Sequence, residues 1–149
     1  MARRFPEIVA YGSAFRFAIE AEGACGDIAA AADAQAPDGA WRSRLEELTS
    51  AHRDQAEKLR TIRQEVNEMI LEPIHSLDSA AYLGALDEDP APTWPAVVEQ
   101  LIAAEQAAAR YHDDFVTQCD DVLAASARAF KKAAKRDRAA AEELQKMLG

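Results

Sequence analysis

Apolar residues recur along this chain at alternating steps of three and four, the spacing of one buried helix face. The clearest stretch lies between Trp41 and Met69, where two polar residues, His52 and Gln55, interrupt the apolar seam at its middle. The seam positions are Trp41, Leu45, Leu48, His52, Gln55, Leu59, Ile62, Val66 and Met69. Burying polar groups is unfavourable unless partners satisfy them. We therefore expect a polar site inside the core that this helix faces.

Three further stretches show the same spacing, so the pattern predicts four helices. The first helix is predicted over residues 6–33 and the second over residues 40–71, where Pro73 stops it. The third is expected to begin after Thr93, and its seam ends at Cys119. The seam of the fourth runs from Leu123 to Met147.

The lengths of the connections predict how these helices are joined. Short turns are expected at residues 35–39 and 120–121, whereas residues 72–93 form a long connection with a short helix near residues 77–86. Extended, about 22 residues span roughly 70 Å, and the second helix is only about 48 Å long. The connection can therefore return to the other end of the bundle. We expect one all-α domain over residues 1–149, a four-helix bundle of two hairpins joined by a crossover.

Composition and charge limit which classes of partner and which cellular compartment we expect for this chain. The net charge of −9 argues against nucleic acid and anionic membranes, and the basic residues of the last helix are expected to form a solvated face. No apolar run is long enough for a transmembrane helix, and no signal-peptide core follows the basic start. Cys25 and Cys119 lie on apolar seams outside any Cys-x-x-Cys motif. We expect structural thiols in a reducing compartment, hence a cytoplasmic protein.

Each predicted helix carries a polar residue near the middle of its seam: Glu22, His52, Glu105 and Asp137. Within each hairpin the two polar positions lie equally far from the turn, so they should share one level. Three carboxylates brought together without a cation repel one another, and at least one would stay protonated. A bound divalent metal removes that conflict and also satisfies His52.

Two more polar seam residues are accessory candidates. Gln55 is expected to be a hydrogen-bonding neighbour of the site rather than a ligand. His112 follows Glu105 by two turns and is expected above or below the centre, either as a fifth ligand or as a hydrogen-bonded neighbour. A chain with four matched polar positions is also compatible with a site that has lost its metal.

The chain resembles the ferritin-like superfamily, and within it the rubrerythrin-like branch, over nearly its whole length. Residues 17–24 and 101–111 are similar to the Ala-Ile-Glu-x-Glu stretches of that family's first and third helices. Its second and fourth helices carry Glu-x-x-His followed by Ala-Glu-x-Leu. This chain keeps the second part as Ala-Glu-Lys-Leu at residues 56–59 and Ala-Glu-Glu-Leu at residues 141–144.

The resemblance implies a non-haem iron site and, in an active protein, oxygen or peroxide redox chemistry. The family's two single glutamates correspond to Glu22 and Glu105. Its two Glu-x-x-His motifs align with His52 and Gln55 and with Asp137 and Ala140. Gln55 and Ala140 therefore stand where the family has its two histidines. Imidazole cannot bridge two irons as a carboxylate does. The altered ligand set leaves a single-metal site, another altered site and no metal as alternatives.

Two classes of function follow. The first is a metal-binding protein that uses Glu22, His52, Glu105 and Asp137, with iron or another divalent ion as cofactor; whether it is an enzyme stays open. The second is a non-catalytic interaction protein that has lost the metal and dimerises through a helix face. The resemblance implies a homodimer in either case, and the apolar residues outside the seams offer a surface for it. These residues are Ile19, Val97 and Ile102.

Overall fold

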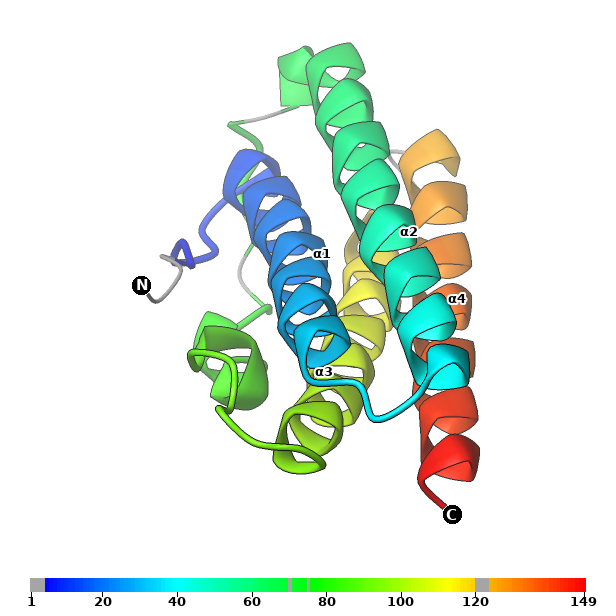
Figure 1. Cartoon of the computed structure of the whole chain (residues 1–149). Helices are drawn as coiled ribbons and strands as arrows, with labels where there is room; N and C mark the ends of the chain where they lie inside the picture. The colour runs from blue at the N-terminus through cyan, green and yellow to red at the C-terminus, as the bar shows by residue number, and fades with distance from the viewer. Residues whose placement is uncertain (1–4, 70, 75, 120–123) are drawn as a thin grey trace.

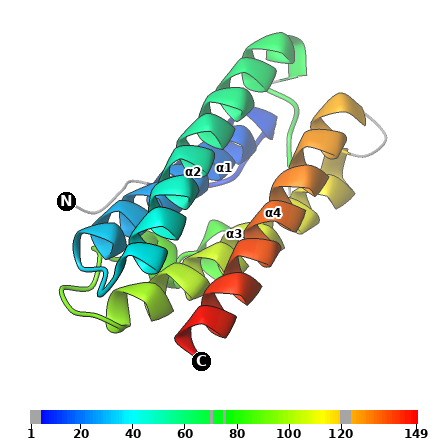
Figure 2. The same cartoon turned by 45° about the vertical axis from the view of Figure 1, so that its right-hand side comes forward.

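Four helices form the molecule in a computed structural model that describes residues 5–69, 71–74, 76–119 and 124–149. The helices are α1 (Tyr11–Ala34), α2 (Gly39–Glu65), α3 (Ala96–Cys119) and α4 (Ala124–Leu148). Helix α1 pairs with α2 and α3 pairs with α4, and the two hairpins meet mainly through α1 and α3 (Figure 1, Figure 2). No strand occurs among the described residues. The predicted all-α four-helix bundle of two hairpins is confirmed.

The long connection between the hairpins runs from one end of the bundle to the other. Helix α2 ends at the top of the view in Figure 1, and α3 begins at the bottom. Between them the chain forms short 3-10 helices at Asn67–Met69, Ser79–Ala81 and Gly84–Asp87. The crossover is therefore confirmed, whereas the single short helix predicted near residues 77–86 is replaced by two 3-10 turns. The predicted link at residues 120–121 lies outside the described residues.

Two helix ends differ from the prediction, and a contact between distant segments explains the first. Helix α1 begins at Tyr11 rather than near residue 6, because Ala10 is extended and pairs with Pro73 in an antiparallel bridge. The Tyr11 amide donates to the Glu72 carbonyl at 3.0 Å. Helix α2 ends at Glu65, six residues before the predicted end. Its start matches the prediction within one residue, and the Asp38 side chain caps it.

The apolar core has two parts. One cluster is rich in alanine and leucine and includes Trp41, against which Trp94 packs edge-on at 4.8 Å between ring centroids. The other is aromatic, and in it the rings of Phe115 and Phe130 stack at 4.1 Å. Along all four helices a layer of polar side chains separates the two clusters.

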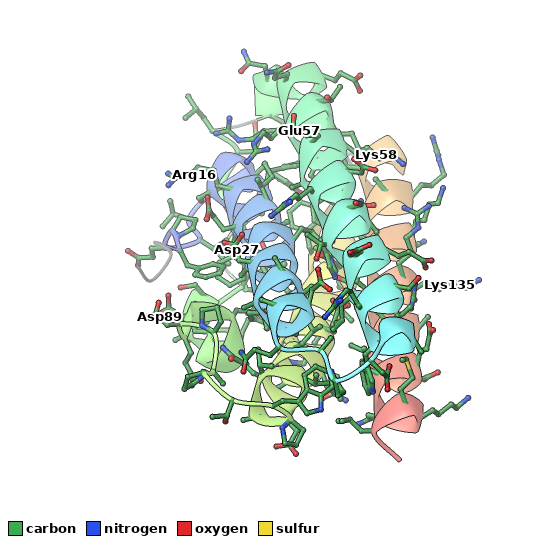
Figure 3. The ribbon with its side chains drawn as sticks, viewed as in Figure 1. Arg16, Asp27, Glu57, Lys58, Asp89 and Lys135 are labelled. Atoms are coloured by element: carbon green, nitrogen blue, oxygen red, sulfur yellow. The ribbon has the colours of Figure 1, made fainter. Side chains whose placement is uncertain are left out.

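The outer surface is charged. Arg16 on α1, Lys58 on α2 and Lys135 on α4 point away from the bundle (Figure 3). The basic residues of α4 are exposed, as predicted; they are Arg128, Lys131, Lys132, Lys135, Arg136 and Arg138. No helix in the described part of the chain combines the length and the hydropathy that a membrane span requires.

The surface predicted for dimerisation is wrong. Ile19, Val97 and Ile102 are buried in the fold, with exposed fractions of 6%, 0% and 7%. They pack within the bundle because each helix buries more than one narrow seam, since it contacts both its hairpin partner and the other hairpin. These three residues are not available to a second copy of the chain.

Candidate metal centre

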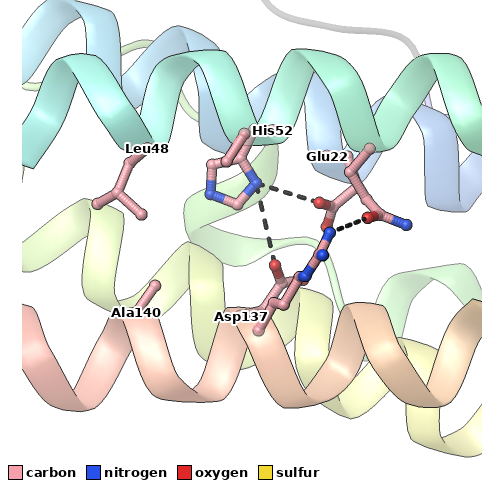
Figure 4. Close-up of a pocket in the computed structure, with 8 residues that line it drawn as sticks. Glu22, Leu48, His52, Asp137 and Ala140 are labelled. Atoms are coloured by element: carbon pink, nitrogen blue, oxygen red, sulfur yellow. Dashed lines mark hydrogen bonds and ion pairs between the residues drawn. The ribbon is translucent and has the colours of Figure 1, made fainter.

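Four buried polar side chains converge from the four helices. Glu22 lies on α1, His52 on α2, Glu105 on α3 and Asp137 on α4, with exposed fractions of 1%, 4%, 0% and 2%. Figure 4 shows Glu22, His52 and Asp137 pointing toward one another. The predicted convergence of these residues in one buried layer is confirmed.

His52 lies at the centre of the layer, between carboxyl groups on both edges of its ring. Its Nδ1 lies 3.1 Å from Glu22 Oε1 and 3.9 Å from Asp137 Oδ1, and its Nε2 is in close contact with Glu105 Oε1. Helices α1 and α2 pack closely at Gly26: a Cβ there would lie 3.4 Å from the His52 Cβ, in ordinary van der Waals contact, so a side chain larger than alanine would press against His52. The local sequence of α1 thus helps to set the position of the imidazole.

His112 belongs to the same layer. Its Nε2 donates to Glu22 Oε2 at 3.0 Å and lies 3.3 Å from Asp137 Oδ2. The sequence predicted it above or below the centre, because it follows Glu105 by two turns. Glu22 explains the difference, since one of its carboxylate oxygens faces His52 and the other faces His112. His112 therefore orients two carboxyl groups of the layer.

The charges of the layer shift the pKa values of the two histidines upward. Burial opposes the charged form of His52, but the carboxylates of Glu105 and Glu22 raise its pKa well above the usual value. Burial likewise disfavours charged His112, yet hydrogen bonds with Asp137 and Glu22 raise its pKa to about 9. Both imidazoles are therefore protonated at neutral pH in the metal-free protein, and the doubly protonated His52 donates to Glu22 and Glu105.

The carboxyl groups respond in opposite directions. Burial alone would raise the pKa of Glu22, but the charge of His52 and hydrogen bonds from His112 and His52 outweigh it and hold that pKa far below its usual range. Burial and the charge of Glu22 raise the pKa of Asp137 well above the usual value. Burial also raises the pKa of Glu105. In the metal-free protein, the protons on His52 and His112 thus offset the repulsion among the carboxyl groups.

Two ligand atoms of the layer have no hydrogen-bond partner among the described residues. They are Glu105 Oε2 and His112 Nδ1, and both are buried. Unsatisfied buried polar atoms are rare and unfavourable, and a cation beside Glu105 would satisfy its unpartnered oxygen. One ligand atom each from Glu22, His52 and Asp137 lies within 4.8 Å of the others. This donor set fits a divalent metal ion.

Cys25 is a member of the site that the sequence analysis missed. It was predicted as a structural thiol, and it is indeed buried, but its sulfur lies within 4.8 Å of ligand atoms of His52 and Glu105. The sequence contained a signal, because Cys25 follows Glu22 by three residues and so shares its helix face. The side chain of Cys119 lies outside the described part of the structure.

A small cavity gives access to the layer between α2 and α4. Its volume is about 40 Å³, enough for one or two water molecules. It is lined by Glu22, Leu48, Ala51, His52, Gln55, Arg136, Asp137 and Ala140. The exposed Arg136 donates from Nη1 to Gln55 Oε1 at 3.2 Å and so bridges the two helices beside the cavity. Gln55 is thus a hydrogen-bonding neighbour of the cluster.

Comparison of the chain with protein-family models, with curated proteins and with solved structures gives no match.

Proposed function

We propose that this chain is a metal-binding protein of the ferritin-like type whose buried layer binds a divalent ion, iron first among the candidates. The observation that supports it most is the Glu22, His52 and Asp137 set, in which one ligand atom from each residue lies within 4.8 Å of the others. These residues come from three helices, and the set adjoins a cavity of about 40 Å³. Two carboxylates and one imidazole would neutralise a divalent ion while supplying three ligands.

The residues around such an ion would have three roles: to bind it, to position its ligands and to restrict access from solvent. Glu22, His52 and Asp137 would hold it, and His112 would keep the two carboxylates in position by its contacts with both. Arg136 and Gln55 restrict the approach from solvent. A redox-active ion supplies electrons for oxygen or peroxide chemistry when bound. The cavity is too small for a bulky organic substrate, which favours a small oxidant over a large one.

The experiment is a chelator and metal titration of thermal stability, with elemental analysis of protein purified without chelator. Because the ligands assemble only in the folded chain, metal binding adds to the free energy of unfolding. Metal at a hundred times its Kd adds about 3 kcal/mol, which raises Tm by roughly 5 to 10 °C for a chain of this size. Chelator should remove that increase, and Fe²⁺, Mn²⁺ or Zn²⁺ should restore it.

Asp137→Asn tests whether the response arises in this layer. It keeps the shape of the side chain and removes its charge, so it should abolish the response to Mn²⁺, an ion that prefers oxygen ligands. Asp54→Asn, an exposed position on α2, is the matched control and should keep it. No metal on purification, together with a melting curve that ignores chelator and added metal, would refute the proposal. That result would favour the non-catalytic interaction protein, in which Asp137→Asn is neutral or stabilising because it relieves repulsion with Glu22.

A further inference from the structure

The two nitrogens of His52 face two chemically different sets of ligand atoms. Nδ1 lies near Glu22 Oε1 and Asp137 Oδ1, at 3.1 and 3.9 Å, and both of these ligands are oxygens. Nε2 lies against Glu105 Oε1. The Cys25 sulfur, one ligand atom of Glu105 and one ring nitrogen of His52 lie within 4.8 Å of one another. One imidazole therefore belongs both to an oxygen set and to a set that contains sulfur.

A second observation points to a ligand on the sulfur side. Glu105 has an exposed fraction of 0%, and its Oε2 has no hydrogen-bond partner among the described residues. An acceptor so deeply buried is satisfied only by a donor or a cation. Cys25 is equally buried, with an exposed fraction of 0%. The three ligand atoms are thus gathered in a site shielded from solvent.

We propose that Cys25, His52 and Glu105 form a second, thiolate-containing metal half-site, and that His52 sorts metal ions between this set and the oxygen set. This inference rests on the proposed metal-binding function and specifies which metal ions the protein would select. Thiolates favour zinc and cuprous ions, whereas carboxylates suit manganese. When the metal binds, the Cys25 thiol and the protonated His52 each release one proton to solvent, and the thiolate and the Glu105 carboxylate together balance the charge of a divalent ion.

His52 limits the protein to one ion at a time. A neutral imidazole carries a proton on one ring nitrogen and a lone pair on the other. It can therefore bind a metal through Nδ1 or through Nε2, but not through both. An ion that prefers oxygen takes the set with Glu22 and Asp137, and an ion that prefers sulfur takes the set with Cys25. The chain binds either kind with a stoichiometry of one.

Cobalt titration tests the thiolate directly, because a cobalt–thiolate bond gives a charge-transfer band in the near ultraviolet. The chain has two cysteines, so a band that persists in Cys119→Ser must come from Cys25. Cys119 is a suitable control because it follows Glu105 by fourteen residues on α3, about 21 Å along the helix axis. We expect the band in the wild-type protein and in Cys119→Ser, and its loss in Cys25→Ser. The first two spectra decide the question even if Cys25→Ser does not fold.

Competition between Zn²⁺ and Mn²⁺ tests the sorting. In Cys25→Ser the affinity for Zn²⁺ should fall by about tenfold or more, while the affinity for Mn²⁺ stays unchanged. A wild-type protein that binds Co²⁺ without the charge-transfer band overturns the half-site and leaves the proposed metal centre intact, as does a band that only Cys119→Ser removes. If Cys25→Ser loses affinity for Zn²⁺ and Mn²⁺ to the same extent, His52 does not sort the two ions. A chain that binds none of these ions overturns this inference together with the proposed function.

Discussion

Raising the pH should destabilise the metal-free protein in a range where most proteins change little. The pKa of His112 is 6.5 in an ordinary environment and about 9 in the fold, so between about pH 6.5 and pH 8 the folded chain keeps a proton that the unfolded chain loses. A raised pKa gives stability that is fully present below the unfolded value and is lost as the pH rises toward the folded value. The slope approaches about 1.4 kcal/mol per pH unit. His112 alone should therefore lower the free energy of unfolding by about 2 kcal/mol.

The other groups of the layer do not cancel this loss. The pKa of His52 is also raised, so its contribution has the same sign. The pKa of Glu22 is lowered, so its stabilisation is lost only in acid and stays constant across this range. Urea denaturation followed by circular dichroism, with chelator present, measures the change. With saturating Mn²⁺ the slope should flatten or reverse, because the metal requires the deprotonated ligands. An unfolding free energy that stays level or rises in chelator would refute the assignment of protonated histidines.

Two further predictions concern the approach to the site and the packing beside it. Arg136→Gln removes a cation from the mouth of the cavity, so at low salt Mn²⁺ should associate about twofold to tenfold faster, measured by stopped flow. Arg128→Gln, at an exposed position eight residues before Arg136 on α4, is the control. Equal association rates of Mn²⁺ with the two variants would exclude a role for Arg136. Gly26→Leu should destabilise the protein by about 1–3 kcal/mol by forcing α2 away from α1, whereas Gly26→Ala should stay within about 1 kcal/mol of wild type. Chemical denaturation measures both, and a stable Gly26→Leu variant would show that the close helix approach is unimportant.

The phase of the helices could be predicted from the sequence, because the period of the apolar seam fixes which side chains face inward. That period is sufficient to place Glu22, His52, Glu105 and Asp137 in the interior. The period does not give the reach of a side chain across a helix interface. For this reason the sequence predicts His112 above or below the centre, whereas its contact with Glu22 brings it into the layer. The period also does not distinguish a packing residue from a metal ligand at a seam position. Cys25 is therefore predicted as a structural thiol, although it shares a helix face with Glu22.

Helix ends were less predictable, since contacts between distant segments determine them. Pro6 is a favourable first residue for a helix, yet Ala10 is extended where it pairs with Pro73, and the helix begins only after it. Residues 66–71 have no sequence signal that stops a helix before Pro73, and the chain nevertheless turns into a 3-10 helix at Asn67–Met69. The surface assigned to dimerisation failed for a related reason, because each helix contacts two neighbours and buries a broad face.

The division of the apolar core into two clusters has a consequence for cooperativity. The aromatic cluster around Phe130 and the cluster around Leu144 are joined across a layer of ionisable groups rather than by continuous apolar packing. Each cluster draws on all four helices, so each can stay packed while the other opens. In the metal-free protein the amides of the two ends should therefore exchange with solvent as separate units with different opening free energies. An ion bound between Glu22, His52 and Asp137 ties three helices together at the boundary, and the two ends should then open only as one.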